Sequence, residues 1–239
     1  MLRLRHYGEL IIRGYTICTI PRTGSNFLCE LLSSTGVLGK PREYFNGAGR
    51  RVHDDPTYPD DPAEQFRRIL TMGSTPNGVY GLKVFPDQHD VFARACAWTK
   101  LLPGLSFISL ERRDTLGQAL SWARVVQTGQ YRSTVPLSSP EVYEPELIHA
   151  LLEKAIKDRA RWSLFFARTG IQPLAVFYED VAANPQAEVD RIAAFIGGCG
   201  PAIVRPELIE VKVQRDTLME EWRNRFRAEY GNPDVIDPI

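Results

Sequence analysis

The chain has 239 residues, 44% of them hydrophobic, so it can bury the core of one large α/β domain. Its 29 basic and 29 acidic residues balance, which excludes a global field that would recruit nucleic acid or an anionic membrane. The four cysteines form no C-x-x-C pair, and no run approaches the ~18 apolar residues of a membrane span. We therefore expect one domain over 1–239 in the cytoplasm, with reduced thiols and with 1–13 as a loose N-terminal extension.

The first predicted elements are a strand, a loop and a helix. Residues 15–20 (YTICTI) form an apolar run typical of a buried strand, 21–25 form a tight turn, and 25–34 show helical spacing. Such a loop directs backbone N–H groups and the positive end of a helix dipole at one point, so it predicts an oxyanion site. The loop lacks the G-x-x-x-x-G-K-[ST] motif of proteins that bind nucleoside triphosphates.

Side chains of this loop add to the predicted oxyanion site. Gly24 would allow a ligand to approach the backbone closely. The expected side-chain donors are Arg22, Thr23, Ser25 and Asn26.

The rest of the chain alternates between predicted strands and helices. Strands are expected at 79–85, 105–110 and 173–178, and helices at 63–72, 88–98, 115–128, 144–169, 185–197 and 216–230. This alternation predicts a P-loop-like α/β fold, in which a parallel sheet has helices on both faces and ligands bind at the carboxyl ends of the strands. Polar stretches at 46–62 and 129–145 are expected to be surface loops. The last helix carries Leu218, Trp222 and Phe226 at four-residue spacing, which predicts packing on the core.

A second strand, loop and helix strengthens the prediction of a phosphate site. Arg112 and Arg113 follow the strand at 105–110, and Asp114 is a suitable N-cap for the helix at 115–128. Ser121 lies in that helix, so a phosphate held by either arginine could also receive its hydroxyl.

Together these features resemble sulfotransferases that use 3′-phosphoadenosine 5′-phosphosulfate (PAPS), and more narrowly the bacterial trehalose sulfotransferase family. There are two departures from the family pattern: Asn26 stands where a hydroxyl residue is commoner, and 47–62 has no counterpart. The second departure leaves the acceptor open. The matching stretches, in family order, are IPRTGSN (20–26), TGVLGKPREYFN (35–46), GLKV (81–84), RRD with QALS (112–114 and 118–121), YEDV (178–181) and EWRNRF (221–226).

The resemblance implies roles for individual residues. The first loop would hold the 5′-phosphosulfate, with Arg22 near the bridging oxygen of the donor, while Arg112 or Arg113 and Ser121 would hold the 3′-phosphate. Glu43 matches the carboxylate proposed as the base that takes the acceptor proton. His53 is the rival base.

Lys83 ends a predicted strand and would supply a further cation at the transferring group, unless it only extends its charge into solvent. No metal is expected, since fixed cations and N–H groups can stabilise a sulfuryl group of low net charge. The resemblance also implies a homodimer and a sugar hydroxyl as acceptor, with a glycolipid or a small metabolite alcohol as other possibilities. Two different functions stay open: a nucleotide or small-molecule kinase, and a non-catalytic module that binds adenosine phosphates.

Overall fold

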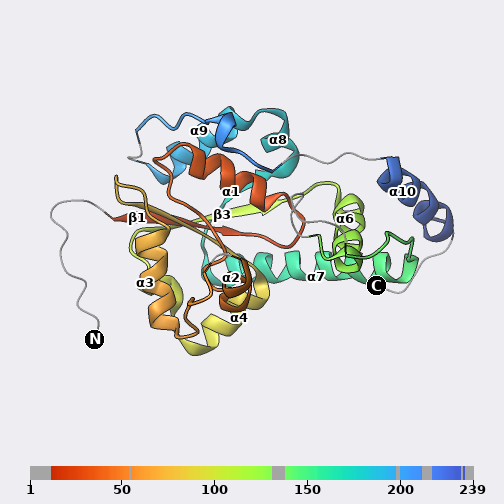
Figure 1. Cartoon of the computed structure of the whole chain (residues 1–239), viewed down its shortest axis with the longest axis horizontal. Helices are drawn as coiled ribbons and strands as arrows, with labels where there is room; N and C mark the ends of the chain where they lie inside the picture. The colour runs from red at the N-terminus through yellow and green to blue at the C-terminus, as the bar shows by residue number, and fades with distance from the viewer. Residues whose placement is uncertain are drawn as a thin grey trace.

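The computed structural model describes residues 12–53, 55–130, 138–197, 200–211, 217–232 and 234. These residues build a four-stranded parallel sheet in the order β2-β1-β3-β4 (Figure 1). The α/β class and all four strands predicted from apolar runs are confirmed. The strands are β1 (Arg13–Cys18), β2 (Val79–Val84), β3 (Leu105–Glu111) and β4 (Leu174–Phe177).

Eleven helical segments are found in the described part of the chain. None of these helices is both long and apolar enough to cross a membrane. The bounds are α1 (Ser25–Ser34), α2 (Gly47–His53), α3 (Pro62–Met72), α4 (Pro86–Ala95), α5 (Trp98–Leu101), α6 (Thr115–Thr128), α7 (Pro145–Thr169), α8 (Tyr178–Ala183), α9 (Pro185–Ile196), the 3-10 helix η1 (Pro206–Leu208) and α10 (Thr217–Tyr230).

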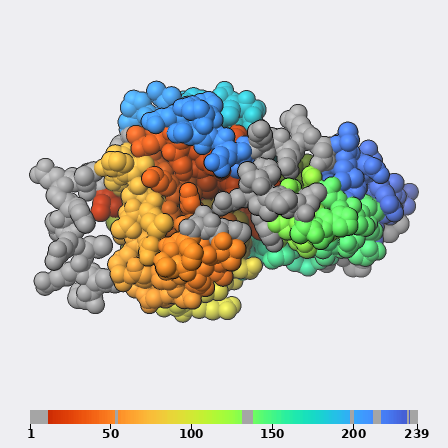
Figure 2. Space-filling model, in the orientation of Figure 1, coloured from red at the N-terminus to blue at the C-terminus, as the bar shows by residue number. Residues whose placement is uncertain are grey.

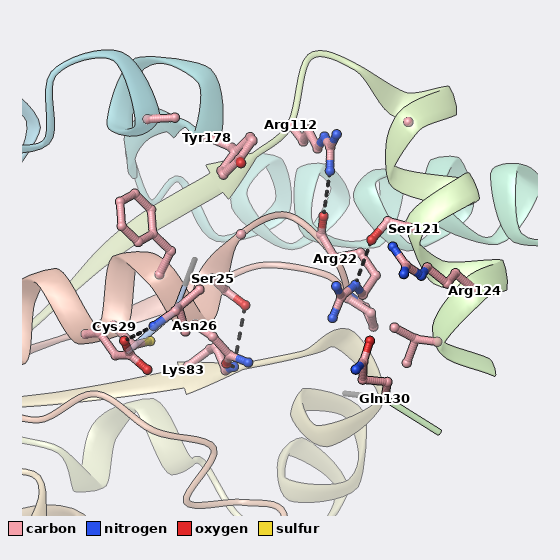
Figure 3. Close-up of a pocket in the computed structure, with 18 of the residues that line it drawn as sticks. Arg22, Ser25, Asn26, Cys29, Lys83, Arg112, Ser121, Arg124, Gln130 and Tyr178 are labelled. Carbon is pink, nitrogen blue, oxygen red and sulfur yellow. Dashed lines mark hydrogen bonds between the residues drawn. The ribbon is translucent and has the colours of Figure 1, made fainter. Parts of the chain in front are cut away.

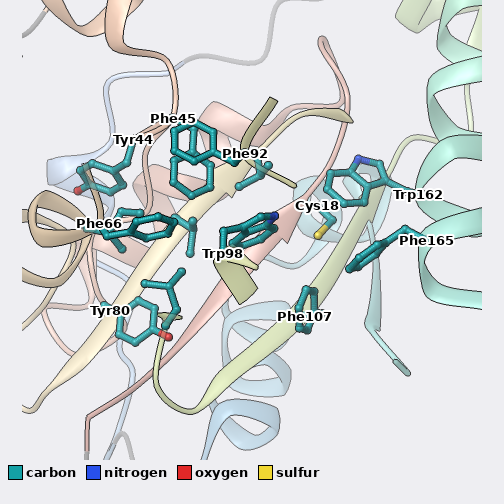
Figure 4. Packing of buried hydrophobic residues seen from close by; sticks show 14 of the residues in the cluster. Cys18, Tyr44, Phe45, Phe66, Tyr80, Phe92, Trp98, Phe107, Trp162 and Phe165 are labelled. Atoms are coloured by element: carbon teal, nitrogen blue, oxygen red, sulfur yellow. The ribbon is translucent and has the colours of Figure 1, made fainter. Parts of the chain in front are cut away.

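The sheet is covered on both faces, as expected for parallel strands. Figure 1 shows α1 and α9 above the sheet and α3, α4 and α7 below it. Successive residues of β1 point to opposite faces, so Tyr15 and Ile17 join the apolar cluster with α1 and α9, whereas Cys18 joins the other cluster. That second cluster is rich in aromatic side chains, among them the stacked rings of Phe45 and Phe92 (Figure 4).

A third apolar cluster joins α6, α7 and α10. Trp222 and Phe226 of α10 are buried against Leu120 of α6 and Ile148 of α7. The packing role predicted for Trp222 and Phe226 is therefore confirmed, and Leu218 lies partly buried beside them. Figure 2 shows the blue α10 at one end of the molecule, next to green surface.

The register of the strands aligns the loops that matter for function. Cys18 at the end of β1 pairs with Val84 at the end of β2 and with Ser109 near the end of β3. The loop after β1, the residues after β2 and the loop after β3 therefore begin at the same edge of the sheet. This is where parallel α/β folds bind ligands.

Three expectations need correction. Residues 46–62 are not simply a surface loop, because α2 lies there and Arg50 is buried with its guanidinium 5.1 and 5.0 Å from the ring centroids of Tyr44 and Tyr58. The helix expected at 88–98 is two helices, since Cys96 has an extended backbone that ends α4. Arg13 belongs to β1, so the expected N-terminal extension does not include residue 13. Residues 1–11 and 131–137 lie outside the described parts.

Candidate active site

A cavity of about 1820 Å³ opens at the carboxyl edge of the sheet. It is lined by residues that follow each of the four strands, as Figure 3 shows in close-up. These include Arg22 after β1, Phe85 after β2, Arg112 after β3 and Tyr178 after β4. The two loops predicted to bind phosphate therefore face one shared space.

The backbone of the first loop is held in two left-handed conformations. Gly24 has φ +80°, and a Cβ there would lie 2.2 Å from the ring of Tyr178, so no other residue fits without rearrangement. Arg22 has φ +64°, which is uncommon for a residue with a side chain. Its Nε donates to the hydroxyl of Ser121 on α6 at 3.1 Å, so the strained residue links the two predicted phosphate loops.

The hydroxyl of Thr23 is directed into the protein and not into the cavity. It is fully buried, lies 2.6 Å from the hydroxyl of Thr19 and donates to the carbonyl of Ile20 at 3.0 Å. The Thr19 carbonyl in turn accepts a bond of 2.9 Å from Trp162 Nε1. The Thr23 side chain therefore stabilises the loop from inside the protein, and only the backbone of Thr23 remains to bind a ligand.

Lys83 connects the first loop to Glu43. The side chain of Lys83 is 4% exposed, and its ammonium donates to Asn26 Oδ1 at 2.7 Å and to Ser25 Oγ at 3.4 Å (Figure 3). It also forms an ion pair of 2.8 Å with Glu43 Oε1. The backbone N–H of Lys83 donates to the Arg42 carbonyl at 2.9 Å, which fixes the segment carrying Glu43 beside β2. Lys83 is therefore an internal cation and not a strand-end lysine in solvent.

Glu43 is held ionised by its surroundings. Its second oxygen, Oε2, accepts bonds of 3.2 Å from Asn46 Nδ2 and from Gln88 Nε2. Burial alone would raise the pKa of Glu43, but the charge and hydrogen bond of Lys83, together with the two amides, bring the pKa below its ordinary value. The carboxylate is thus ready to accept a proton at neutral pH.

The two arginines after β3 point to different places. Arg112 lines the cavity, with its guanidinium 5.2 Å from the ring centroid of Tyr178. Arg113 is not among the lining residues: it makes two bonds of 2.7 Å to the carboxylate of Asp180 on α8 and lies over Phe177. The structure therefore brings Arg112, and not Arg113, into the cavity with Ser121.

Asp114 ties the second loop to the C-terminal helix. Its carboxylate caps α6 by accepting from the Gly117 N–H at 2.9 Å and binds both terminal nitrogens of Arg223 on α10 at 2.9 and 2.7 Å. The hydrogen bond from Arg223 is the main reason why the pKa of Asp114 falls to about 2. Asp114 also lies 3.5 Å from Arg112, so it orients two cavity arginines.

Several lining residues were missed by the sequence analysis. Tyr178, which the sequence analysis used only as part of the matching stretch 178–181, lines the cavity. Arg124, which pairs with Glu141, and Gln130 also line it, on and just after α6. The spacing of Arg124 three residues after Ser121 was the available signal, because such residues share a helix face.

One expectation falls outside what the structure describes. The side chain of His53, the rival base, is not described. Within the described residues, no group of three or more His, Cys, Asp or Glu side chains is arranged to hold a metal ion.

Comparisons with known proteins agree with this geometry. Residues 14–229 match the model of the Stf0 sulphotransferase family. The chain is 27% identical to a trehalose 2-sulfotransferase of Mycobacterium tuberculosis (strain ATCC 35801 / TMC 107 / Erdman), over 91% of this chain and 96% of that protein. It is 26% identical to a trehalose 2-sulfotransferase of Mycolicibacterium smegmatis (strain ATCC 700084 / mc(2)155), over 90% and 95% of the two chains.

Proposed function

Since the chain belongs to the Stf0 sulphotransferase family, we propose that it transfers a sulfuryl group from PAPS to a hydroxyl group of a carbohydrate. The observation that carries this proposal is that a partly buried, ionised carboxylate, Glu43, shares one cavity with the oxyanion loop and with Arg112. A binding module would need the loop and the arginine only. A base beside them is what a transferase adds.

The donor would be held by both loops. Backbone N–H groups at the start of α1, with Ser25 and Asn26, suit the 5′-phosphosulfate. Arg112 and Ser121 suit the 3′-phosphate, because Arg112 Nε has no hydrogen-bond partner among the described residues and its terminal nitrogens lie 3.5 Å from the Arg22 carbonyl and from Asp114 Oδ2. A guanidinium with so much unused donor capacity fits a phosphate.

The residues divide the chemistry of transfer among them. Glu43 takes the proton as the O–H bond of the acceptor breaks and its oxygen bonds to sulfur. The sulfur–oxygen bond to the donor phosphate breaks at the same time, and its electron pair stays on the phosphate. Arg22 stabilises that charge but is a poor proton donor, because a guanidinium stays charged. Lys83 holds Glu43 against the loop.

A carbohydrate acceptor is supported by the two trehalose 2-sulfotransferases to which the chain is similar. The cavity wall near Glu43 offers polar and cationic side chains for hydroxyl groups, namely Lys40, Arg42, Asn46 and Arg50. A glycolipid or another small alcohol would present the same reacting group, so the acceptor must be found by assay.

Two measurements test the proposal. Calorimetry should give tenfold or greater preference for adenosine 3′,5′-bisphosphate over adenosine 5′-monophosphate and ATP, since each phosphate–arginine bond contributes roughly 1.5–3 kcal/mol. Incubation with PAPS and a panel of sugars, glycolipids and small alcohols should give one product heavier by one sulfuryl group. Equal or tighter binding of ATP would instead favour a kinase and would contradict the proposal.

A further inference from the structure

Two amide side chains meet at one oxygen of Glu43. Asn46 precedes α2, and its Oδ1 accepts a bond of 3.0 Å from the Gly49 N–H. Gln88 lies in the first turn of α4, and its Oε1 accepts a bond of 3.0 Å from the Phe85 N–H. Each helix start therefore holds the carbonyl end of its amide, which fixes the direction of the NH₂ group. Both NH₂ groups then donate to Glu43 Oε2 at 3.2 Å.

Space around the first amide is equally restricted. A Cβ at Gly49 would lie 2.5 Å from Asn46 Nδ2, so this position must be glycine if Asn46 is to fold over the helix start. The two amides come from different parts of the sequence, because Asn46 lies directly before α2 and Gln88 lies in α4, after β2. Capping uses only the carbonyl oxygen of each amide, so it does not account for the contacts of the two NH₂ groups with Glu43.

The hydrogen bonds leave the two oxygens of Glu43 in different states. A carboxylate oxygen accepts about two hydrogen bonds. Oε2 already accepts two, from Asn46 and Gln88, whereas among the described residues only Lys83 donates to Oε1. One lone pair of Oε1 remains for a further proton.

We propose that Asn46 and Gln88 are positioning residues that clamp Oε2 of Glu43, so that Oε1 takes the proton of the acceptor hydroxyl. The inference rests on the proposed transfer reaction and adds to it the groups that aim the base. Loss of either amide should let the carboxylate rotate and should destabilise its ionised form relative to its protonated form.

Other charged groups around Glu43 do not replace the clamp. Lys83 lies on β2, and Arg42 directly precedes Glu43 in the chain. Arg22 and Arg50 line the same cavity. Cys29 on α1 also lines the cavity, but burial raises the pKa of its thiol to about 11, so it is neutral near pH 7. From α4, the neighbour of Glu43 is the uncharged Gln88, while Asp87 is paired with Arg161 of α7. The amides are therefore the neutral donors that distinguish Oε2 from Oε1.

The test converts each amide into a carboxylate that keeps the cap. In Gln88→Glu and Asn46→Asp, the oxygen that accepts the backbone N–H remains. The NH₂ group that donates to Glu43 is replaced by a carboxylate oxygen, which carries the same negative charge as Glu43. We expect the midpoint of the Glu43 side-chain ¹³C resonance, assigned by its absence in Glu43→Gln, to rise by about one pH unit or more. The midpoint of the acid limb in the pH profile of kcat should move to higher pH by the same amount. Gln88→Met, which removes the donor without adding charge, should give a smaller rise and about tenfold lower kcat with unchanged donor affinity.

The matched control is Gln186→Glu. Gln186 also accepts from a backbone N–H, that of Val204, and donates to a carboxylate, that of Asp190, but it does not line the cavity. A Glu43 midpoint that stays unchanged in the clamp variants, or that moves equally in Gln186→Glu, overturns the clamp. If Gln88→Glu does not fold, Gln88→Met decides the question by the same titration. If the midpoint moves while no acceptor gains a sulfuryl group, the clamp stands and the proposed function fails.

Discussion

The two ends of the cavity are built differently. At the Glu43 end, the carboxylate is held at 2.8 Å by Lys83 and at 3.2 Å by two amides, each fixed by a bond from the start of a helix. At the Arg112 end, the arginine makes contacts of 3.5 Å, and its partner Asp114 depends on Arg223 from the C-terminal helix, 109 residues away. A preorganised end suits chemistry, and an end with spare donor capacity suits binding of an anion. Variants at the two ends should therefore affect different kinetic constants.

The largest effect should come from removing the base. Glu43→Gln keeps the shape of the side chain but cannot take a proton, so kcat should fall by ~10²–10⁴-fold. Steady-state turnover with PAPS and an identified acceptor measures this loss, and thermal unfolding shows whether the fold is kept. Turnover within a few-fold of the original would remove Glu43 from the mechanism and direct attention to His53.

The pH dependence sharpens the same point. Because the pKa of Glu43 lies below its ordinary value, turnover should hold steady through neutral pH and fall only below the usual glutamate range of ~4.3.

The next largest effect should lie at the other end. Arg112→Ala removes a charged donor from the proposed phosphate site, so donor affinity should weaken by about 10- to 100-fold. Ser121→Ala should weaken it less, since a neutral hydroxyl is lost. Arg113→Ala is the matched control, because Arg113 is bound to Asp180 outside the cavity lining. Equal losses for Arg112→Ala and Arg113→Ala, measured by calorimetry, would refute this division.

The smallest effect concerns the tie between α6 and α10. The pKa of Asp114 is about 2 in the folded protein and ~3.9 in an unfolded chain. A lowered pKa stabilises the fold above ~3.9, and this contribution disappears as the pH falls towards 2. Arg223→Ala should therefore lower Tm modestly at pH 6 and progressively less between pH 4 and pH 2. A Tm difference that is constant with pH would show that the ion pair contributes nothing.

Local patterns in the sequence predicted the sheet and much of the site. Apolar runs located the strands, and residues near the strand ends, such as Lys83 within β2 and Arg22 in the loop after β1, could be placed at one edge because parallel strands end together. The choice between Arg112 and Arg113 could not be made, because it depends on Asp180, a partner 67 residues later. The single domain over 1–239 and the homodimer stay predictions.

The contacts of Asn46 and Gln88 with Glu43 also could not be predicted from sequence patterns. Asn46 lies in a stretch whose Gly, Asp and Pro content is typical of loops, and only tertiary contacts of Arg50 with two tyrosine rings reveal that Arg50, within this stretch, is buried. Gln88 has no local signal for its contact with Glu43, 45 residues earlier. Thr23 could be expected to donate to a ligand until the structure showed its hydroxyl bonded to Thr19.

The central claim is that the Glu43 end carries the chemistry and the Arg112 end carries donor binding. The most direct test is the dissociation constant of adenosine 3′,5′-bisphosphate for Glu43→Gln, measured by calorimetry beside the original protein and Arg112→Ala. The account predicts that Glu43→Gln binds within about twofold of the original, since it changes no proposed donor contact. A loss of affinity as large as that of Arg112→Ala would contradict the separation of the two ends.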